Sequence, residues 1–349
     1  MTAVSKFSFQ ALDETLKRLK DGERPRRIAL LVIQEPQFTP DQDRAPRQHG
    51  VTAILRLGRS EVSPAVPADG LPRVAVDAAD LSAFDLGVIY DPRYWDGYQE
   101  IGMRPKVRDA VMACDLPIIP YAANAERYPL LPEPYFAGAD VMKLRLDDTI
   151  YQYISRNNLR GDYAEFGTWF GRSFYRSFLY FKEQLDGNFW AFDSFGGLPK
   201  TSPSEAEFTK GDFTEGRYFC NEASFRTIGQ MIFPQEQRLR ERIKLVKGFY
   251  DQTLDGHTIQ DYGIAEHSIS YCSIDCDLFD ATLSVLHFIA PALQNGAVMY
   301  LDDYRMARAA KGASLYDAVR VWLGENPGYH LIDLHREHWQ HQYVIFNRY

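Results

Sequence analysis

The chain contains few cysteines and no long apolar run. Its four cysteines, Cys114, Cys220, Cys272 and Cys276, are too few and too scattered along 349 residues for a disulfide framework. No segment reaches the roughly 18 uninterrupted apolar residues of a membrane-spanning helix. Residues 1–27 are polar and charged, without the apolar core of a signal peptide. We therefore expect a cytoplasmic protein that makes no membrane contact.

Runs of basic residues are also missing. Lys and Arg together number 39 against 47 Asp and Glu, which gives a formal net charge of -8. Proteins that bind nucleic acid usually offer a basic patch to the phosphates, so the composition argues against a nucleic-acid partner. Hydrophobic residues make up 45% of the chain, and its length allows two domains of ordinary size. The partner that we expect is a small molecule.

The first motif is a glycine-containing turn within residues 161–171. The sequence up to Phe166 is typical of a strand, Gly167 and Gly171 of a tight turn, and residues 172–185 of a helix. The first N–H groups of such a helix have no partner inside the helix and suit a partly anionic ligand. One glycine of the usual three-glycine dinucleotide fingerprint is missing, so the motif alone fits a plain structural turn equally well.

The next predicted strand, residues 188–194, supplies an acidic residue. Asp193 lies near the end of this strand, 22 residues after Gly171. An acidic side chain at the end of the second strand is placed to accept hydrogen bonds from both ribose hydroxyls of an adenosine. The turn and Asp193 together predict a site for a nucleoside-containing cofactor.

Residues 1–140 form a separate region in the sequence pattern. Short apolar runs of strand length alternate there with proline-rich connections, and one segment suits a helix. We predict a small α/β accessory domain without visible chemistry, which serves dimer contacts or covers the pocket of the second domain. The strands are expected at residues 27–34, 51–57, 73–76 and 86–90, and the helix at 104–114.

In residues 141–349 strands alternate with helices. This alternation predicts an α/β fold with a doubly wound, mostly parallel sheet and helices on both faces. The last two strands follow each other closely and suit an antiparallel hairpin at the sheet edge. The strands are expected at residues 162–166, 188–194, 242–246, 268–274, 297–301, 330–334 and 342–346, and the helices at 142–158, 172–185, 222–232, 279–293 and 315–323.

A polar loop, residues 196–221, interrupts this alternation. Loops of such length inside a compact domain are usually functional lids or flexible insertions. Its aromatic residues Phe213, Tyr218 and Phe219 either line a substrate pocket or anchor the loop locally.

Aspartates follow two of the later strands. Asp275 and Asp277 come directly after residues 268–274, and Asp302 and Asp303 follow residues 297–301. If a right-handed crossover joins these strands, Asp275, Asp302 and Asp303 converge at one rim of the sheet. Three carboxylates there either keep one proton or hold a hard divalent cation such as Mg2+. In the alternative interpretation, Asp277 or Asp303 only caps the next helix.

From Gly161 onward the chain resembles class I S-adenosylmethionine-dependent methyltransferases, and more narrowly the macrocin O-methyltransferase family, which methylates sugar hydroxyls on natural products. Five ordered blocks carry the resemblance. They are Glu165-Phe-Gly-Thr-Trp-Phe-Gly171, Asp193-Ser-Phe-Gly-Gly-Leu-Pro199, Lys247-Gly-Phe-Tyr-Asp-Gln-Thr-Leu254, Ile274-Asp-Cys-Asp-Leu-Phe279 and Leu301-Asp-Asp-Tyr304. Phe170 and the pair Arg172-Ser173 depart from the family pattern of that glycine turn.

The resemblance implies a role for each block. Glu165, Gly167 and Gly171 would surround the methionine end of S-adenosylmethionine, Asp193 would hold its ribose, and Gly248 and Phe249 would lie near its adenine. Asp275, Asp302 and Asp303 would ligate Mg2+. The complete set of expected cofactor-binding residues is Glu165, Gly167, Thr168, Trp169, Gly171, Ser173, Asp193, Ser194, Gly248 and Phe249.

Methyl transfer to a sugar hydroxyl needs in-line alignment and removal of the hydroxyl proton. A bound Mg2+ would lower the hydroxyl pKa, and Asp275 is the candidate for metal ligand and catalytic base. The histidines, among them His257, His267 and His341, are expected to be surface or structural residues.

Other functions remain open from the sequence. A nicotinamide oxidoreductase would share the glycine turn and Asp193, but it would not explain the later aspartates. A metal-dependent sugar transferase or an aspartyl-phosphate phosphatase could use Asp275 and Asp277, although Phe279 and Asp280 do not fit the phosphatase pattern. A non-catalytic binding protein on the same scaffold is a further alternative. The sequence leaves the acceptor hydroxyl open, and a homodimer is expected only from related enzymes.

Overall fold

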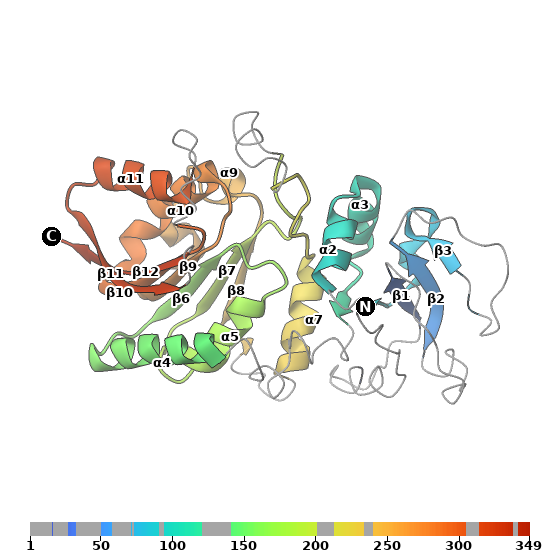
Figure 1. Ribbon diagram of the computed structural model, residues 1–349, viewed down its shortest axis with the longest axis horizontal. Helices are drawn as coiled ribbons and strands as arrows, with labels where there is room; N and C mark the ends of the chain where they lie inside the picture. Colours follow the sequence, from blue (N-terminus) through green and yellow to red (C-terminus); the bar gives the residue numbers. More distant parts are fainter. Residues whose placement is uncertain are drawn as a thin grey trace.

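We describe a computed structural model of the chain, in which two β-sheets lie side by side (Figure 1). The N-terminal sheet and its helices occupy one end of the molecule, and the larger sheet with the C-terminus occupies the other. The residues that the structure describes are 16, 27–32, 50–57, 71, 73–90, 94–120, 141–200, 213–233, 240–304, 314–337 and 341–349.

The larger sheet has seven strands in the order β11-β12-β10-β9-β6-β7-β8. Strands β6 to β10 pair in parallel, whereas β12 pairs antiparallel with both β10 and β11. This confirms the predicted doubly wound, mostly parallel sheet with a closing hairpin. The strands are β6 (Asp162–Phe166), β7 (Phe189–Asp193), β8 (Ile243–Lys247), β9 (Ile269–Ile274), β10 (Leu293–Leu301), β11 (Tyr329–Glu337) and β12 (His341–Arg348).

Helices cover both faces of this sheet (Figure 1). Helices α4 and α5 lie on one face, and α10 and α11 lie on the other. Their bounds are α4 (Val141–Arg156), α5 (Arg172–Phe181), α7 (Glu222–Ile232), α9 (Tyr250–Thr253), α10 (Phe279–Ile289) and α11 (Leu315–Glu325). The predicted helices are therefore present, although α5 and α10 each end four residues earlier than the apolar pattern suggested. After α10, strand β10 begins at Leu293, four residues before the predicted start of that strand.

Aromatic packing fixes the helices against the sheet. Helix α5 buries its residues at helical spacing, among them Phe174, Phe178 and Phe181. The Phe181 ring lies 5.3 Å from that of Tyr271 on β9. On the opposite face Phe166 stacks on Phe192 at 4.5 Å. The central strands β6 and β9 are buried along their whole length, so their carboxyl ends are held rigidly.

The N-terminal sheet has five strands in the order β3-β2-β1-β4-β5, and all of them pair in parallel. The four predicted strands and the predicted helix are present, but α2 and β5 were not predicted. Helix α2 contains an internal glycine and several polar residues, and β5 is only three residues long. The elements are β1 (Ile28–Val32), β2 (Val51–Arg56), β3 (Arg73–Ala75), β4 (Leu86–Tyr90), β5 (Ile118–Pro120), α2 (Tyr94–Gly102) and α3 (Pro105–Cys114).

The predicted boundary between the two regions, at residue 140, lies outside the described residues. So does the middle of the predicted polar loop, residues 201–212. Within the described part of the chain, none of the helices has the length and apolar character that crossing a membrane requires.

Arg242 ties the start of β8 to the end of α5. Its guanidinium donates hydrogen bonds to the carbonyls of Lys182 at 2.8 Å and Gly187 at 2.7 Å, and also to that of Leu185. We expect Arg242→Met to lower the free energy of unfolding by about 2 kcal/mol, because these carbonyls lose charged donors. Urea denaturation measures the loss.

The matched control is Arg226→Met. Arg226 is more than half exposed and pairs with Glu222 one helical turn away, so its loss should cost less than about 0.5 kcal/mol. Equal losses for the two variants would contradict the structural role of Arg242.

Candidate active site

A cavity of about 680 Å3 opens at the carboxyl ends of β6, β7, β8, β9 and β10. Its volume lies within the range of small-molecule sites, and its position is the one expected for ligands of open α/β sheets. The residues that line it are Gly167, Trp169, Asp193, Ser194, Gly197, Leu198, Pro199, Lys200, Tyr218, Gly248, Phe249, Tyr250, Asp251, Asp255, Asp275, Cys276, Asp277, Leu278, Asp280, Ala281, Ser284, Asp302 and Asp303.

The glycine turn after β6 lies directly against the end of β9. Gly167 has a φ of 81°, and a Cβ atom added to it would lie 1.8 Å from the carbonyl oxygen of Asp275. The N–H of Asp275 in turn donates to the carbonyl of Phe166 at 2.9 Å. Glycine is therefore required at position 167, because any side chain would separate the turn from Asp275.

Gly171 serves packing and does not line the cavity. It has a φ of 85° as the N-cap of α5, and an added Cβ atom would lie 2.6 Å from the Tyr175 ring and 2.7 Å from that of Phe225. The expectation that Gly171 contacts the cofactor stays a prediction that its position does not favour.

Asp193 holds the glycine turn in place. One carboxylate oxygen accepts hydrogen bonds from the N–H groups of Thr168 at 2.7 Å and Trp169 at 2.9 Å, and the other accepts from the N–H of Phe195 at 2.7 Å. Burial raises the pKa of Asp193, and these N–H groups oppose the rise. The carboxylate lines the cavity, but much of its capacity to accept hydrogen bonds is already used within the protein.

Glu165 lies behind the cavity wall. It is completely buried, accepts a hydrogen bond from Ser173 Oγ at 2.5 Å and accepts another from the Tyr163 hydroxyl. Burial raises the pKa of Glu165 to about 7, against the opposing effect of these hydroxyl groups. Glu165 therefore orients Ser173 and does not itself line either of the cavities described here.

A second cavity, of about 210 Å3, lies on the α5 side of Gly167. Thr168 and Ser173 line it, together with the basic residues Arg172 and Arg176. Gly167, Trp169, Asp275 and Asp302 line both cavities. The two cavities therefore meet at the glycine turn.

The other end of the large cavity is formed by the turn after β8. Gly248 has a φ of 145°, and its N–H donates to the carbonyl of Asp193 at 3.0 Å. Ser194, Gly248 and Phe249 all line the cavity, so this group of predicted cofactor residues is brought together.

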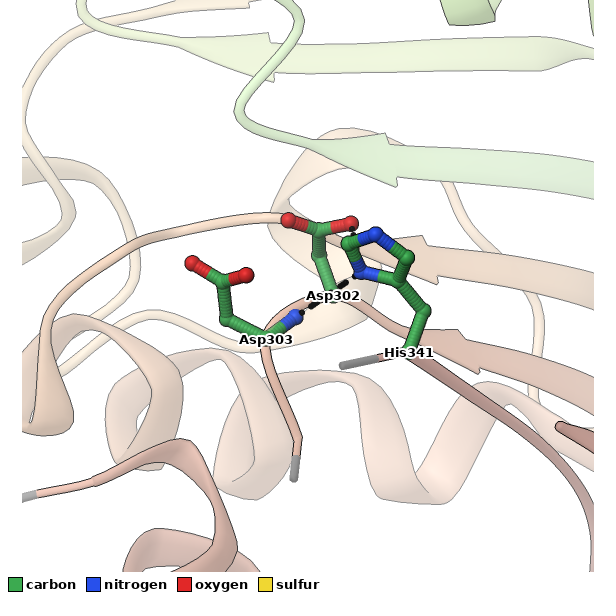
Figure 2. Close-up of side chains that lie close together, drawn as sticks. All are labelled: Asp302, Asp303 and His341. Carbon is green, nitrogen blue, oxygen red and sulfur yellow. Dashed lines mark hydrogen bonds and ion pairs between the residues drawn. The ribbon is translucent and has the colours of Figure 1, made fainter. Parts of the chain in front are cut away.

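An acidic cluster with one histidine lies where β10 ends (Figure 2). Ligand atoms of Asp302, Asp303 and His341 lie within 4.8 Å of one another. The Nδ1 atom of His341 lies 2.8 Å from an oxygen of Asp302, and the Tyr300 hydroxyl donates to Asp302. Burial alone would raise the pKa of Asp302, but the hydrogen bond and charge of His341 hold it below its ordinary value. This arrangement can hold a divalent cation.

His341 belongs to this cluster. It is half-buried and pairs with Asp302, which is compatible with the structural role expected for the histidines. The antiparallel pairing of β10 with β12 places Leu301 opposite Gln342, so the next residues on each strand, Asp302 and His341, meet. His341 is therefore brought to the cluster by strand register, for which the sequence carries no motif.

Asp275 lies beside this cluster at the end of β9. It is not one of the three residues whose ligand atoms converge, but it lines both cavities with Asp302. Burial raises the pKa of Asp275 well above its ordinary value, and the negative charges of Asp302, Asp277 and Asp303 raise it further. Asp275, Asp302 and Asp303 thus lie at one rim as predicted, whereas the ligand atoms that converge are those of Asp302, Asp303 and His341.

The alternative interpretation, in which Asp277 or Asp303 only caps the next helix, is wrong for the helices described here. The N-cap of α10 is Leu278 and has no side-chain cap, so Asp277 does not serve there. Ser314, in a capping box with Asp317, caps α11 in place of Asp303.

Four non-glycine residues with left-handed backbone surround the large cavity. They are Trp169, Tyr218, Asp277 and Asp303, with φ values between 48° and 61°. Such residues carry strain and gather at functional sites.

Of the three predicted loop aromatics, Tyr218 lines the cavity, whereas Phe213 and Phe219 are buried anchors.

We expect Gly167→Ala to lower the free energy of unfolding by about 3 kcal/mol or to displace the turn, because the added methyl group meets a backbone carbonyl. Gly256→Ala is the matched control, since Gly256 has a φ of 80° and no atom within 4 Å of an added Cβ. That variant carries only the left-handed backbone penalty of about 1 kcal/mol. Chemical denaturation compares the two, and equal losses would contradict the contact with Asp275.

Glu165 should make stability depend on pH. Its pKa is about 7 in the folded state against 4.5 as the ordinary value, so the folded state binds the proton more tightly. The contribution of Glu165 to the free energy of unfolding is fully present below pH 4.5. It is lost as the pH rises through 7, by about 3 kcal/mol in total. Urea denaturation of Glu165→Gln between pH 4.5 and 8 should show a correspondingly smaller decline than wild type. The exposed control Glu266→Gln should keep the wild-type slope, and an unchanged slope in Glu165→Gln would overturn the assignment.

Residues 123–320 match the family described as macrocin O-methyltransferase (TylF). Mycinamicin III 3''-O-methyltransferase of Micromonospora griseorubida is 26% identical over 155 residues, which cover 43% of this chain and 57% of that protein. Demethyldecarbamoylnovobiocin O-methyltransferase of Streptomyces niveus is 24% identical over 159 residues, or 45% of this chain and 58% of that protein. The chain thus spans somewhat more than half the length of these relatives.

Two solved structures are similar at lower identity. The O-methyltransferase NovP has a TM-score of 0.45 and 20% identity, and covers 60% of this chain and 81% of its own. The calicheamicin methyltransferase CalS11 has a TM-score of 0.44 and 17% identity, and covers 64% of this chain and 84% of its own. The family match covers β6 to β10 with the helices between them, and it confirms the predicted class I methyltransferase fold. Because this match extends over more than half of the sequence, the chain belongs to the macrocin O-methyltransferase family.

Proposed function

We propose that this chain is an O-methyltransferase that moves a methyl group from S-adenosylmethionine to a hydroxyl of a sugar or sugar-bearing natural product. One observation carries the proposal: the glycine turn, the Asp193 and Gly248 wall and the acidic cluster share a single cavity. The relatives from Micromonospora griseorubida and Streptomyces niveus are both named as O-methyltransferases. Membership of this family argues against the nicotinamide oxidoreductase and phosphatase alternatives.

The cofactor fits across the carboxyl ends of β6, β7 and β8. Gly248 and Phe249 would take the adenine, and Asp193 and Ser194 would take the ribose. The methionine end would lie at Gly167 and extend toward the second cavity. There Arg172, Arg176 and the first N–H groups of α5 suit the methionine carboxylate, and Glu165 would act by orienting Ser173.

The acidic cluster suits a hard divalent cation such as Mg2+. Asp302 and Asp303 offer carboxylate oxygens and His341 a ring nitrogen, and oxygen ligands are those that Mg2+ prefers. Asp275 adds a further carboxyl at the same rim. Bound there, the cation would lower the pKa of an acceptor hydroxyl and fix its orientation.

Asp275 is the proposed catalytic base. In an in-line displacement the bond between sulfur and methyl breaks as the bond between methyl and acceptor oxygen forms, and the hydroxyl proton must leave. The carboxyl group of Asp275 lies between the glycine turn and the acidic cluster and lines both cavities. Burial and the neighbouring carboxylates raise the pKa of Asp275, and a cation bound at the acidic cluster would favour the deprotonated form that a base requires.

We expect Asp275→Ala to lower turnover at least 100-fold, because both the base and a carboxyl of the cation site are lost. Transfer of a labelled methyl group from S-adenosylmethionine to a panel of glycosides measures turnover, and EDTA should abolish the wild-type rate. Calorimetry with S-adenosylhomocysteine should show unchanged cofactor affinity in the variant.

Asp280→Ala is the matched control, since Asp280 lines the same cavity from the first turn of α10. It should keep turnover within about threefold of wild type. Turnover that is equal in Asp275→Ala and wild type would refute the role of Asp275. A wild-type protein that fails to bind S-adenosylhomocysteine would refute the proposed function itself.

A further inference from the structure

The N-terminal sheet precedes residue 123, where the family match begins. The family therefore assigns no role to this N-terminal unit, which we define as β1 to β5 with α2 and α3. Figure 1 shows α2 facing α7 and the segment that leads into it. This segment comprises residues 213–221, and it ends the loop that begins after β7.

Helices α2 and α3 contact residues 215–218 of this segment. The side chain of Gln99 accepts a hydrogen bond from the N–H of Tyr218 at 2.9 Å. Arg108 forms an ion pair with Glu215 at 3.1 Å. A Cβ atom added to Gly102 would lie 1.9 Å from the carbonyl oxygen of Gly216, so the two backbones are in direct contact.

Strand β5 and the residues just before it contact the end of the segment and the first turn of α7. Asn221 donates from its side chain to the carbonyl of Leu116 at 2.9 Å, and Ser224 Oγ accepts from the N–H of Ile118 at 2.8 Å. Asn221 and Ser224 are buried, so water does not compete for these bonds. The segment is thus held from both ends by the N-terminal unit.

The N-terminal unit also contacts the glycine turn. The ring of Tyr98 on α2 stacks on that of Phe170 at 6.0 Å, with 12° between the planes. Tyr98 is completely buried, and its hydroxyl donates to the carbonyl of Ile118 at 2.6 Å. Phe170, one of the expected departures from the family pattern of the glycine turn, provides this apolar contact to the unit.

Between these contacts lies Tyr218. Its ring meets that of Trp169 edge-on at 5.3 Å, and both residues line the large cavity with Asp275 and Asp303. Tyr218 has a left-handed φ of 56°, a conformation that persists only where surrounding contacts impose it. The hydrogen bond from its N–H to Gln99 is one such contact.

We propose that the N-terminal unit positions Tyr218 as an aromatic wall of the acceptor site, so that this unit determines which hydroxyl-bearing ring the cavity accepts. The inference rests on the proposed function. Aromatic side chains that line a pocket bind the apolar face of a ligand, while a few polar groups orient it. A sugar ring placed against Tyr218 would direct its hydroxyls to the acidic cluster across the cavity.

Hydrogen exchange tests the positioning directly. In the double variant Gln99→Ala, Arg108→Ala, amides of residues 213–221 should exchange at least tenfold faster than in wild type, while those of β9 should not change. The matched control is Arg104→Ala, because Arg104 pairs with Asp77 and Glu100 inside the N-terminal unit. The control should leave residues 213–221 unaffected. Unchanged exchange in the double variant overturns the inference, whatever the protein's activity.

Substitution of Tyr218 tests the acceptor wall. With methyl β-D-glucopyranoside as the acceptor probe, Tyr218→Ala should raise KM about tenfold with a smaller change in kcat, and Tyr218→Phe should stay close to wild type. Affinity for S-adenosylhomocysteine should remain within twofold in both variants. If Tyr218→Ala leaves KM unchanged, the proposed role of the Tyr218 ring as a wall of the acceptor site is overturned. A wild-type protein that binds no S-adenosylhomocysteine refutes the proposed function, and the exchange experiment still decides the positioning.

Discussion

The carboxylate of Asp193 is the contact on which the candidate site depends. Its oxygens accept hydrogen bonds from N–H groups of the turn after β6 and from the N–H of Phe195, two residues after the end of β7. Its backbone carbonyl accepts the N–H of Gly248 after β8. Three turns are thus joined through one residue, which fixes their positions relative to one another in the wall of the large cavity. A carboxylate suits this task because it accepts several hydrogen bonds at once.

Negative charge at the neighbouring strand ends is the second constraint. Asp277, Asp302 and Asp303 lie close enough to Asp275 that the negative charge of each disfavours its ionisation. His341 offsets part of this charge at Asp302. The site therefore combines a wall of glycine turns joined through Asp193, suited to a nucleoside, with an acidic rim, suited to a cation and hydroxyl groups. The two meet at Gly167, where the glycine turn touches Asp275.

Much of this arrangement could be predicted from the sequence. The alternation of strands and helices was sufficient for the larger sheet, and the aspartates after β9 and β10 were expected to meet because parallel neighbours end at the same edge. The position of His341 could not be predicted, since it depends on the register of β12 against β10, 38 residues along the chain. Glu165 was expected at the cofactor, and this stays a prediction, because its buried side chain lies behind Tyr163 and Ser173, which line the second cavity. Pattern alone does not show which polar residue of a buried strand faces a cavity.

The contact between Gln99 and Tyr218 joins residues 119 positions apart, and its consequence concerns the order of assembly. Contacts among β6, β7 and β8 join residues closer in sequence, so closing the cofactor wall costs less chain entropy than closing the opposite wall onto its distant partner. During synthesis the N-terminal residues emerge first. They can be folded before residues 213–221 leave the ribosome, and the late-made segment then closes onto a template that is already in place.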